Sequence, residues 1–332
     1  MNHHENKVRA LGLCSGGLDS ILSAMILRNQ GIAVEWISFE TPFFSSDKAR
    51  RASARLQIPL IVRNITLPYL EMLRNPPCGY GQHMNPCMDC HALMFRLAGE
   101  VMIDKQMDFL FSGEVLGQRP MSQTRPSLRY VEKHSGCRDM IVRPLSAKLL
   151  EETLPEKKRL VDRGLLLGLS GRSRKPQIQL AREWGIADYP APGGGCLLTE
   201  TVYSNRLKDL FDHQSDCTEN ALHLLKYGRH IRLNAQVKII VGRTLHDNTA
   251  ILDHHDPSRD MVIKTRQIPG PVVLIPLGAG NDDIQQAAAI CAGYSKAPEH
   301  MLVPVEVISP GDATTLWVAR MRPESIQSMM IG

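Results

Sequence analysis

The chain has 332 residues, of which 43% are hydrophobic and 22% are charged, and its formal net charge is +5. This composition excludes a disordered chain, and the length favours about two domains. No apolar run approaches the roughly 18 residues that a membrane span needs, and the first residues lack the apolar core of a secretion signal, so we expect a cytoplasmic protein without a membrane partner.

The first third of the chain alternates short apolar runs with amphipathic runs, which is the pattern of a parallel sheet covered by helices. We predict strands at residues 8–14, 32–39, 59–62 and 108–111, and helices at residues 18–29 and 47–56 and from the Cys-rich stretch to residue 105. The predicted fold class is therefore α/β, with a doubly wound parallel sheet.

From about residue 220 the pattern changes to short strands separated by turn residues, with one late helix at residues 282–294. This pattern predicts a smaller, separate α+β domain. We expect a first domain at residues 1–200, a helical connector at 201–227 and the second domain at 228–332.

Basic residues are unevenly distributed along the chain. One cluster lies between Arg119 and Lys148, and another lies between Lys157 and Lys175. Such clusters can attract the phosphates of a nucleic acid. On charge alone, the ordinary interpretation of a solvated surface is favoured.

A glycine-rich turn directly follows the first predicted strand and opens the first predicted helix. It consists of Ser15, Gly16, Gly17, Leu18, Asp19 and Ser20. Two glycines permit a tight turn whose amide groups, with the helix N-terminus, form a place for phosphate. No Gly-Lys-Ser/Thr follows, so this is not a Walker loop. We expect a β-branched residue at Gly17 to be incompatible with the turn.

These six residues match the SGGxDS signature, and the loop resembles that of the PP-loop ATP pyrophosphatases, whose fold is adenine nucleotide α-hydrolase-like. The resemblance implies that ATP is cleaved between its α- and β-phosphates and that AMP passes to an acceptor oxygen. It implies a catalytic Asp19 near Mg²⁺, with Ser15 and Ser20 near pyrophosphate. A purely structural glycine turn is the alternative, because such turns are common in α/β folds.

Cysteines form the second distinctive pattern. Eight cysteines in a cytoplasmic chain indicate metal, redox or buried thiols before disulfides. Cys87 and Cys90 form a Cys-x-x-Cys pair, and Cys196 follows three glycines. Three thiolates suit an iron–sulfur cluster with one open iron. Alone, the pair also fits half of a zinc site or a redox pair.

The segment from Asn85 to Cys90 resembles the thiolation motif of the bacterial 2-thiouridylases, and the segment at Cys196 resembles their second catalytic-cysteine region. Cys87 stands where many of these enzymes have Asp, which is similar to the cluster-dependent members. The resemblance implies a 4Fe-4S cluster on Cys87, Cys90 and Cys196. In the alternative it implies, Cys196 carries a persulfide that Cys90 resolves. We expect a helix N-terminus to favour the Cys90 thiolate.

Residues 112–118 follow a strand and are similar to the corresponding segment of 4-thiouridine synthetases, which places Gly113 and Glu114 at the nucleotide. Together these resemblances imply an ATP-dependent tRNA sulfurtransferase that adenylates a uridine carbonyl and replaces its oxygen with sulfur. The 2- and 4-positions of uridine both remain open. No rhodanese-like segment appears, so we expect sulfur from free sulfide or from a separate donor protein.

The second domain contains several short motifs in a distinctive order and spacing. They are Val241-Gly242-Arg243, Asn248, Pro269-Gly270-Pro271 and the alanine-rich run that ends at Ala297. In this order and spacing they resemble the RNA-binding domain of NFACT-type proteins. The resemblance implies contact with tRNA, and we place phosphates at Arg243, Lys264, Arg266 and Lys296. The alternative is a domain that packs and forms a homodimer without touching RNA.

Two other functions stay open at this point. One is a PP-loop ligase or amidotransferase that acts on a small acceptor, although such chemistry does not need the three cysteines. The other is a non-catalytic RNA- or ribosome-binding protein that has kept a nucleotide fold. Pyrophosphate release in the presence of tRNA distinguishes both from the sulfurtransferase.

Overall fold

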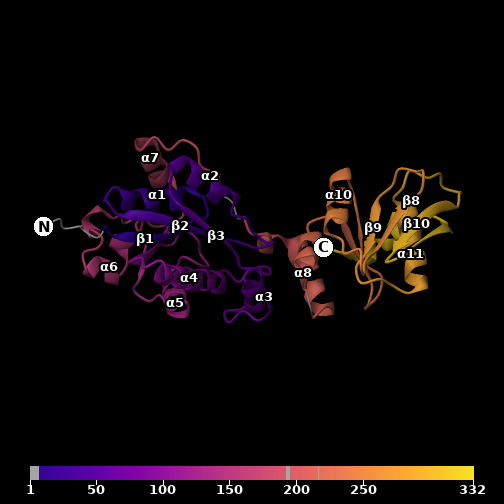
Figure 1. Cartoon of the computed structure of the whole chain (residues 1–332), viewed down its shortest axis with the longest axis horizontal. Helices are drawn as coiled ribbons and strands as arrows, with labels where there is room; N and C mark the ends of the chain where they lie inside the picture. The colour runs from indigo at the N-terminus through magenta and orange to yellow at the C-terminus, as the bar shows by residue number, and fades with distance from the viewer. Residues whose placement is uncertain (1–6, 192–194, 216) are drawn as a thin grey trace. The chain divides into compact units, whose positions relative to one another are not determined.

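The computed structural model describes residues 7–191, 195–215 and 217–332. The chain divides into two compact units, Met1–Leu197 and Leu198–Gly332, which are described separately (Figure 1). Two of the three glycines before Cys196 lie outside the described residues. Within the described ranges, no helix is both long enough and apolar enough to cross a membrane.

The N-terminal unit alternates strands and helices. Its elements are β1 (Arg9–Leu13), α1 (Leu18–Arg28), β2 (Ala33–Glu40), α2 (Asp47–Leu56), β3 (Leu60–Asn64), α3 (Thr66–Arg74), α4 (Cys87–Asp104), β4 (Phe109–Ser112), α5 (Arg125–Ser135), β5 (Ile141–Val142), η1 (Ala147–Leu149), α6 (Leu154–Lys157), η2 (Arg163–Leu165) and α7 (Lys175–Glu183). The strands form a parallel sheet of order β3-β2-β1-β4-β5. The predicted doubly wound α/β class is confirmed.

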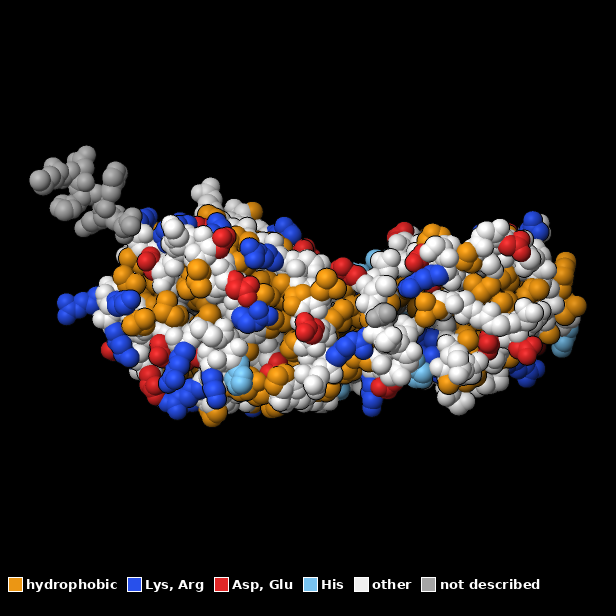
Figure 2. All heavy atoms as spheres, turned by 60° about the horizontal axis from the view of Figure 1, so that its bottom comes forward, with side chains coloured by type: hydrophobic (Ala, Val, Ile, Leu, Met, Phe, Trp, Pro, Cys, Tyr) orange, Lys and Arg blue, Asp and Glu red, His pale blue; other side chains and the backbone are white. Residues whose placement is uncertain are grey.

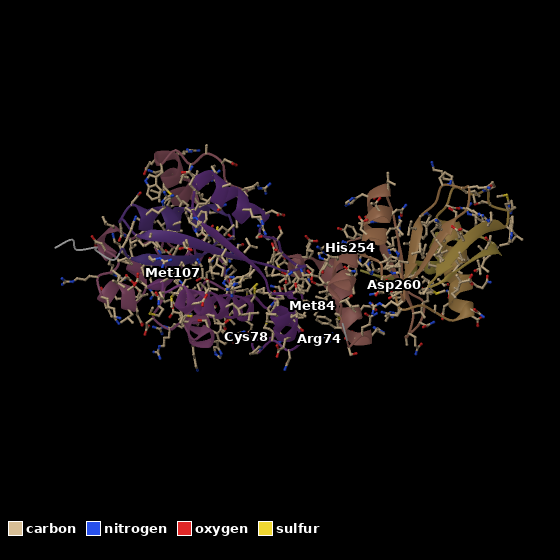
Figure 3. All side chains as sticks on the ribbon, in the orientation of Figure 1. Arg74, Cys78, Met84, Met107, His254 and Asp260 are labelled. Atoms are coloured by element: carbon tan, nitrogen blue, oxygen red, sulfur yellow. The ribbon has the colours of Figure 1, made fainter. Side chains whose placement is uncertain are left out.

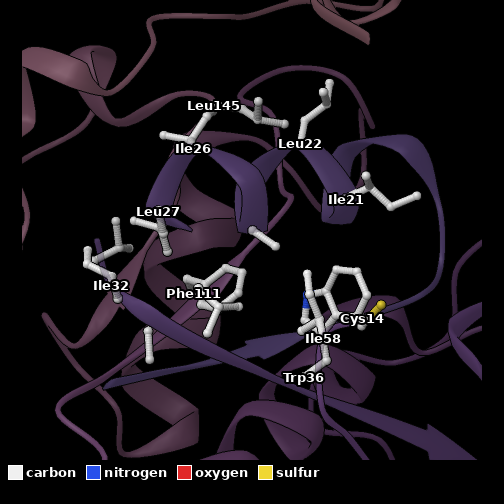
Figure 4. Close-up of a cluster of buried hydrophobic side chains, with 14 of the residues drawn as sticks. Cys14, Ile21, Leu22, Ile26, Leu27, Ile32, Trp36, Ile58, Phe111 and Leu145 are labelled. Atoms are coloured by element: carbon white, nitrogen blue, oxygen red, sulfur yellow. The ribbon is translucent and has the colours of Figure 1, made fainter. Parts of the chain in front are cut away.

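The core of this unit lies between α1 and the sheet (Figure 4). Leu22 and Ile26 of α1 are buried there, and Trp36 of β2 and Phe111 of β4 supply the largest side chains from the sheet. α1 is thus buried on most of its surface, because it crosses over a sheet whose central strands are themselves apolar. The packing holds the first turn of α1 at the end of β1.

The sheet order changes direction at β1, which pairs with β2 on one side and with β4 on the other. Leu13, the last residue of β1, lies opposite Ser112, the last residue of β4. The loops that leave these two strands are therefore neighbours at the carboxyl edge of the sheet. In open α/β sheets, ligands bind at this kind of switch point.

The C-terminal unit contains a seven-stranded sheet of order β11-β10-β8-β9-β7-β6-β12, whose paired strands are antiparallel. Its elements, after η3 (Leu197–Thr199), are α8 (Thr201–His213), α9 (Glu219–Leu224), β6 (Arg229–Arg232), β7 (Lys238–Val241), α10 (Leu245–His254), β8 (Met261–Thr265), β9 (Val272–Ile275), α11 (Asn281–Gly293), β10 (Val303–Ser309), β11 (Asp312–Val318), η4 (Pro323–Met329) and β12 (Met330–Ile331). The predicted second α+β domain is confirmed. Its α10 was not predicted.

Helix α8, which falls in the predicted connector, makes polar contacts with the sheet of the C-terminal unit. Asp209 accepts two hydrogen bonds from Arg232, at 2.6 and 2.9 Å, and pairs with Lys238 at 3.3 Å. Arg206 donates to the carbonyl oxygens of Leu225 and Gly228. Removal of α8 would leave buried charges without partners, so a shortened chain should end before this helix.

Candidate active site

The glycine-rich loop lies between β1 and α1, as predicted, but its two glycines differ. Gly16 has φ +71°, and a Cβ placed on it would lie 2.2 Å from the carbonyl carbon of Lys48. Gly17 has φ −80° and ψ 164°, and a Cβ there would meet only the Ser15 hydroxyl oxygen, at 3.4 Å. The expectation about Gly17 is therefore wrong, because extended backbone accepts β-branched side chains. The constraint belongs to Gly16.

The other loop residues face different ways. Ser15 is exposed, and its hydroxyl accepts a weak hydrogen bond of 3.4 Å from the Gly17 amide. Leu18 is fully buried in the core, and Ser20 is buried and donates to the Gly17 carbonyl oxygen at 2.8 Å. Burial raises the pKa of the neighbouring Cys14 thiol to about 11, so that thiol stays protonated. Among the loop hydroxyls, Ser15 is the one open to a ligand.

Asp19 is the second residue of α1 and combines a fixed oxygen with an unsatisfied one. Its Oδ2 accepts a hydrogen bond of 2.7 Å from Gln118 Nε2, whereas its Oδ1 is buried without a hydrogen-bond partner among the described residues. Gly113 approaches closely, since a Cβ there would lie 2.5 Å from the Asp19 carbonyl carbon. A carboxylate oxygen without a protein partner suits a hard cation such as Mg²⁺.

Glu114 was predicted at the nucleotide, and the structure shows that protein groups hold its carboxylate. Oε1 lies 3.0 Å from His91 Nδ1, and Oε2 accepts from Arg143 at 2.9 Å and from Ser112 at 3.1 Å. Burial alone would raise the pKa of Glu114, but the Arg143 guanidinium and His91 lower it to about 2. The ionised carboxylate thus joins the end of β4 to the first turn of α4.

The Cys-x-x-Cys pair begins α4, with Cys87 as the first helical residue and Cys90 in the first turn. Asn85 organises the approach to this helix. Its side-chain amide donates to Cys87 Sγ at 3.4 Å, and its Oδ1 accepts from the His83 amide at 3.1 Å. The Asn of the predicted thiolation motif therefore orients the first cysteine.

The loop between α3 and α4 has a second anchor in Asp89, which is buried. Its carboxylate accepts from the Cys78 amide at 2.9 Å and from the Tyr130 hydroxyl at 2.7 Å. Figure 3 labels Cys78 and Met84 on this loop. Within the loop, the Cys78 side chain is exposed and the Met84 side chain is buried.

Tyr69 of α3 was not predicted, and it connects the segments that carry the cysteines. Its ring is 1% exposed and packs on Phe43 and Phe44, with ring centroids 5.5 and 5.4 Å away. The amide of Leu197 donates to the Phe43 carbonyl oxygen at 3.0 Å, which brings the adjacent Cys196 to the same region. A single aromatic residue in an amphipathic helix has no spacing signal that would have marked it.

The Tyr69 hydroxyl is hydrogen-bonded to Cys90, and all three predicted cysteines act on it electrostatically. Burial raises the pKa of Cys90, the charges of Cys196 and Cys87 raise it further, and the bond from Tyr69 lowers it. The expected stabilisation of a Cys90 thiolate by the helix N-terminus is therefore outweighed, chiefly by burial. Cys87, Cys90 and Cys196 all raise the pKa of the Tyr69 hydroxyl.

Within residues 7–191, 195–215 and 217–332, no three His, Cys, Asp or Glu side chains form a group arranged to hold a metal ion. Three thiols have the donor chemistry of an iron–sulfur ligand set. Their positions here are not those of a formed ligand set, so the cluster remains a proposal. Asp19, by contrast, offers Mg²⁺ one buried carboxylate oxygen.

Basic and acidic side chains are mixed on the face shown in Figure 2, and residues of both basic clusters form ion pairs with carboxylates. Arg129 pairs with Glu151, and Arg163 pairs with Glu156. Arg143, from the same stretch, is buried between two carboxylates. These contacts support the interpretation of a mixed, solvated surface over that of a nucleic-acid site.

Comparison with known proteins supports both resemblances seen in the sequence. Residues 6–153 match the family model of the thiamine biosynthesis protein (ThiI), and residues 228–330 match that of the NFACT protein RNA binding domain. A protein of Oceanobacillus iheyensis named "Probable tRNA sulfurtransferase" is 26% identical over 155 residues, which cover 44% of this chain and 37% of that protein. One of the same name from Ureaplasma parvum serovar 3 is 29% identical over 159 residues, covering 46% and 40%.

A solved structure of a 4-thiouridine synthetase–RNA complex with bound ATP is 21% identical, with a TM-score of 0.39, and covers 54% of this chain and 41% of that one. The chain spans about two fifths of the length of the curated relatives it matches, 37% of one and 40% of the other. The resemblances to 4-thiouridine synthetases and to the NFACT RNA-binding domain are confirmed: residues 6–153 are similar to the ThiI family and residues 228–330 to the NFACT RNA binding domain.

Proposed function

We propose that this chain is an ATP-dependent tRNA sulfurtransferase. One observation carries the proposal. Two consecutive residues at the end of β4 contact both halves of the site: Gly113 packs against the backbone of Asp19, and Glu114 holds His91, the neighbour of Cys90. The phosphate loop and the cysteine helix are thus joined through one short segment, as a reaction that couples ATP to sulfur transfer requires.

In the first step, the uridine carbonyl oxygen attacks the α-phosphorus of ATP, and the bond to pyrophosphate breaks. The loop amides and the N-terminus of α1 hold the phosphates, and the Ser15 hydroxyl contributes a further polar contact. Mg²⁺, when bound at Asp19, would neutralise charge on the departing pyrophosphate. The reaction converts a poor leaving group, oxide, into part of AMP.

In the second step, a sulfur nucleophile attacks the activated carbon, and AMP leaves with the former carbonyl oxygen. The Tyr69 hydroxyl donates a hydrogen bond to Cys90, and Cys196 acts electrostatically on both residues. A four-iron cluster on the three cysteines would supply an iron that binds sulfide. In the persulfide alternative, the outer sulfur of a Cys196 persulfide is transferred and Cys90 then forms a disulfide with Cys196. Sulfide bound by the iron would be replenished from free sulfide. In the persulfide alternative, free sulfide attacks the disulfide and regenerates the Cys196 persulfide and the Cys90 thiol, or a thiol reductant first opens the disulfide and a donor protein's persulfide then passes its outer sulfur to the Cys196 thiolate.

The experiment that tests this function traces the uridine carbonyl oxygen with an isotope label. The full chain, with ATP, Mg²⁺ and a sulfide source under anaerobic conditions, is given tRNA whose uridine carbonyls carry ¹⁸O. We expect AMP that contains ¹⁸O, in a one-to-one ratio with thiouridine. Labelled AMP cannot arise from a ligase acting on a small acceptor. If tRNA stimulates neither pyrophosphate release nor thiolation, the chain is not a sulfurtransferase.

We further propose that the C-terminal unit binds the tRNA through the sheet face opposite α11. Trp317 of the edge strand β11 is 65% exposed there. It lies opposite Pro304, whose carbonyl oxygen accepts a hydrogen bond of 3.0 Å from the Arg266 amide. Lys264 is exposed on the same face and pairs with Glu306 at 3.2 Å. An exposed aromatic ring beside basic side chains suits an unpaired nucleotide.

Two of the four residues predicted to contact phosphates already have carboxylate partners, which weakens their expected contribution to phosphate binding. Arg243 pairs with Asp247 at 2.9 Å, and Lys264 has its Glu306 partner. We therefore expect Trp317→Ala to weaken tRNA binding by about 1–3 kcal/mol, the range of a lost stacking contact. Val202→Ala, on α8 beside the opposite edge strand β12, removes another exposed apolar side chain and is the control. Equal affinities of the two variants would rule out this face.

A further inference from the structure

The side-chain amides of Gln118 and Gln177 form a hydrogen-bonded chain that ends at Asp19. Neither glutamine belongs to the six-residue loop signature. Gln177, the third residue of α7, is 1% exposed. Its Nε2 donates to Gln118 Oε1 at 2.9 Å, and Gln118 Nε2 donates to Asp19 Oδ2 at 2.7 Å. Residue 177 lies beyond the matched residues 6–153. Three segments far apart in the sequence thus converge on one carboxylate.

The two hydrogen bonds have a direction. A primary amide has a donor side and an acceptor side, so an N–H from Gln177 to Gln118 Oε1 requires that Gln118 turn its own N–H₂ toward Asp19. This arrangement occupies Asp19 Oδ2 and leaves Oδ1 as the oxygen without a partner among the described residues. The amide chain therefore selects which carboxylate oxygen is offered to a ligand.

The backbone keeps the partners in place. Leu116 forms a parallel bridge with Ser170, and the Gly171 amide donates to the Leu116 carbonyl oxygen at 2.8 Å. The Leu116 amide in turn donates to the Ser146 hydroxyl at 2.9 Å. The segment that carries Gln118 is thus tied to the residues just before α7. The Gln118 side chain is therefore held close to Gln177.

We propose that Gln118 and Gln177 are positioning residues that orient the Asp19 carboxylate for the divalent cation of bound ATP. The inference rests on the proposed function, since it assigns Asp19 to that cation. Groups that hold a metal ligand from behind typically change metal affinity or activity by about 10- to 100-fold when removed. A contact that only joined α7 to the loop would change stability and leave the cation requirement alone.

The test compares Gln177→Leu with Gln179→Leu in the full-length chain. Gln179 lies on the same helix but is exposed and bonds Glu183. Binding of Mn²⁺ in the presence of a non-hydrolysable ATP analogue is measured by electron paramagnetic resonance, without tRNA. We expect Gln177→Leu to weaken Mn²⁺ binding about 10- to 100-fold and to raise the Mg²⁺ concentration for half-maximal pyrophosphate release by a similar factor. We expect Gln179→Leu to bind as the unchanged protein does.

A second variant, Gln177→Glu, conserves size and separates orientation from folding. An ionised carboxylate at 177 can only accept, so Gln118 must reverse its amide and turn its carbonyl oxygen toward Asp19. Because burial raises the pKa of a carboxyl at this position, Mn²⁺ binding is compared across a pH series, and the loss should grow as the pH rises. We expect weaker Mn²⁺ binding than in the unchanged protein, with a native circular dichroism spectrum. If both variants at 177 bind Mn²⁺ as the control does, the inference is overturned.

The two proposals fail separately in these measurements. If the unchanged chain thiolates tRNA but substitutions at residue 177 do not change the Mg²⁺ concentration that it requires, the amide chain is structural and the proposed function stands. If cation–nucleotide binding depends on residue 177 but tRNA never stimulates pyrophosphate release, the positioning role stands and the sulfurtransferase proposal fails.

Discussion

The phosphate loop and the cysteine site are built in opposite ways. The loop is contiguous: six residues leave β1, turn at Gly16 and enter α1, so its shape follows from local backbone geometry. The candidate cysteine site combines the start of α4 with a segment more than one hundred residues later, and Tyr69 of α3 is hydrogen-bonded to Cys90. A contiguous motif positions itself, whereas an assembled site depends on every element that packs behind it.

The same difference appears in how the two sites hold charge. The loop offers amides and one carboxylate oxygen without a partner, and both suit a phosphate–cation pair brought by the ligand. The three thiols are partly buried, and burial together with their mutual repulsion raises the pKa of Cys90. Ionisation of Cys90 is therefore disfavoured unless a positive group is brought close to it.

The largest expected effect separates the two sites by their reactions. Asp19→Ala should abolish both pyrophosphate release and thiolation, because the activated uridine never forms. Cys196→Ala should abolish thiolation and retain a single turnover of pyrophosphate release. Both reactions are measured on the same tRNA, with circular dichroism as the control for folding. A Cys196→Ala enzyme that releases no pyrophosphate would mean that the two sites do not act in sequence.

Cys87→Ala asks whether the cysteine site needs all three thiols. If the three hold a cluster, this change should remove most of the iron and all thiolation. If Cys90 and Cys196 form a persulfide pair, thiolation should continue without iron. Iron content and thionucleoside yield are measured anaerobically on one preparation, with Cys78→Ala, an exposed cysteine of the neighbouring loop, as the matched control.

Gly16→Ala against Gly17→Ala tests the local construction of the loop. The first change forces a Cβ to within 2.2 Å of the Lys48 backbone at positive φ, so we expect about 1–3 kcal/mol of destabilisation and a large loss of ATP affinity. The second meets no such obstacle. Urea unfolding and ATP binding by calorimetry give the two values, and equal losses would mean that the loop rearranges on binding.

The smallest expected effect concerns the assembled site. Tyr69→Phe removes the hydroxyl bonded to Cys90 but keeps the ring that packs on Phe43 and Phe44, so we expect about 0.5–1.5 kcal/mol of lost stability. Thiolation should fall while pyrophosphate release is kept. Tyr80→Phe removes a hydroxyl that donates to the Leu73 carbonyl oxygen, and serves as control. Equal thiolation in both variants would show that Tyr69 is only a packing residue.

Much of the fold could be predicted from the sequence, because its signals are local. Alternating apolar runs predicted the strands and helices from β1 to α2, and the change of pattern near residue 220 predicted a second sheet. The loop, with Ser15 and Asp19, was recognisable because its function requires consecutive residues. The cysteines were recognisable by type and context, since thiols in such motifs are uncommon elsewhere.

Other features were decided only by the tertiary structure. Gly16, and not Gly17, bears the constraint because Lys48 of α2 lies against the loop. Tyr69 and Gln177 have no sequence signal, since a buried tyrosine or glutamine in a helix is unremarkable until its partner is known. Their partners come from segments brought together by packing of the whole unit. Sequence marked the candidate chemical groups by residue type and spacing, and long-range packing decided which side chains contact them.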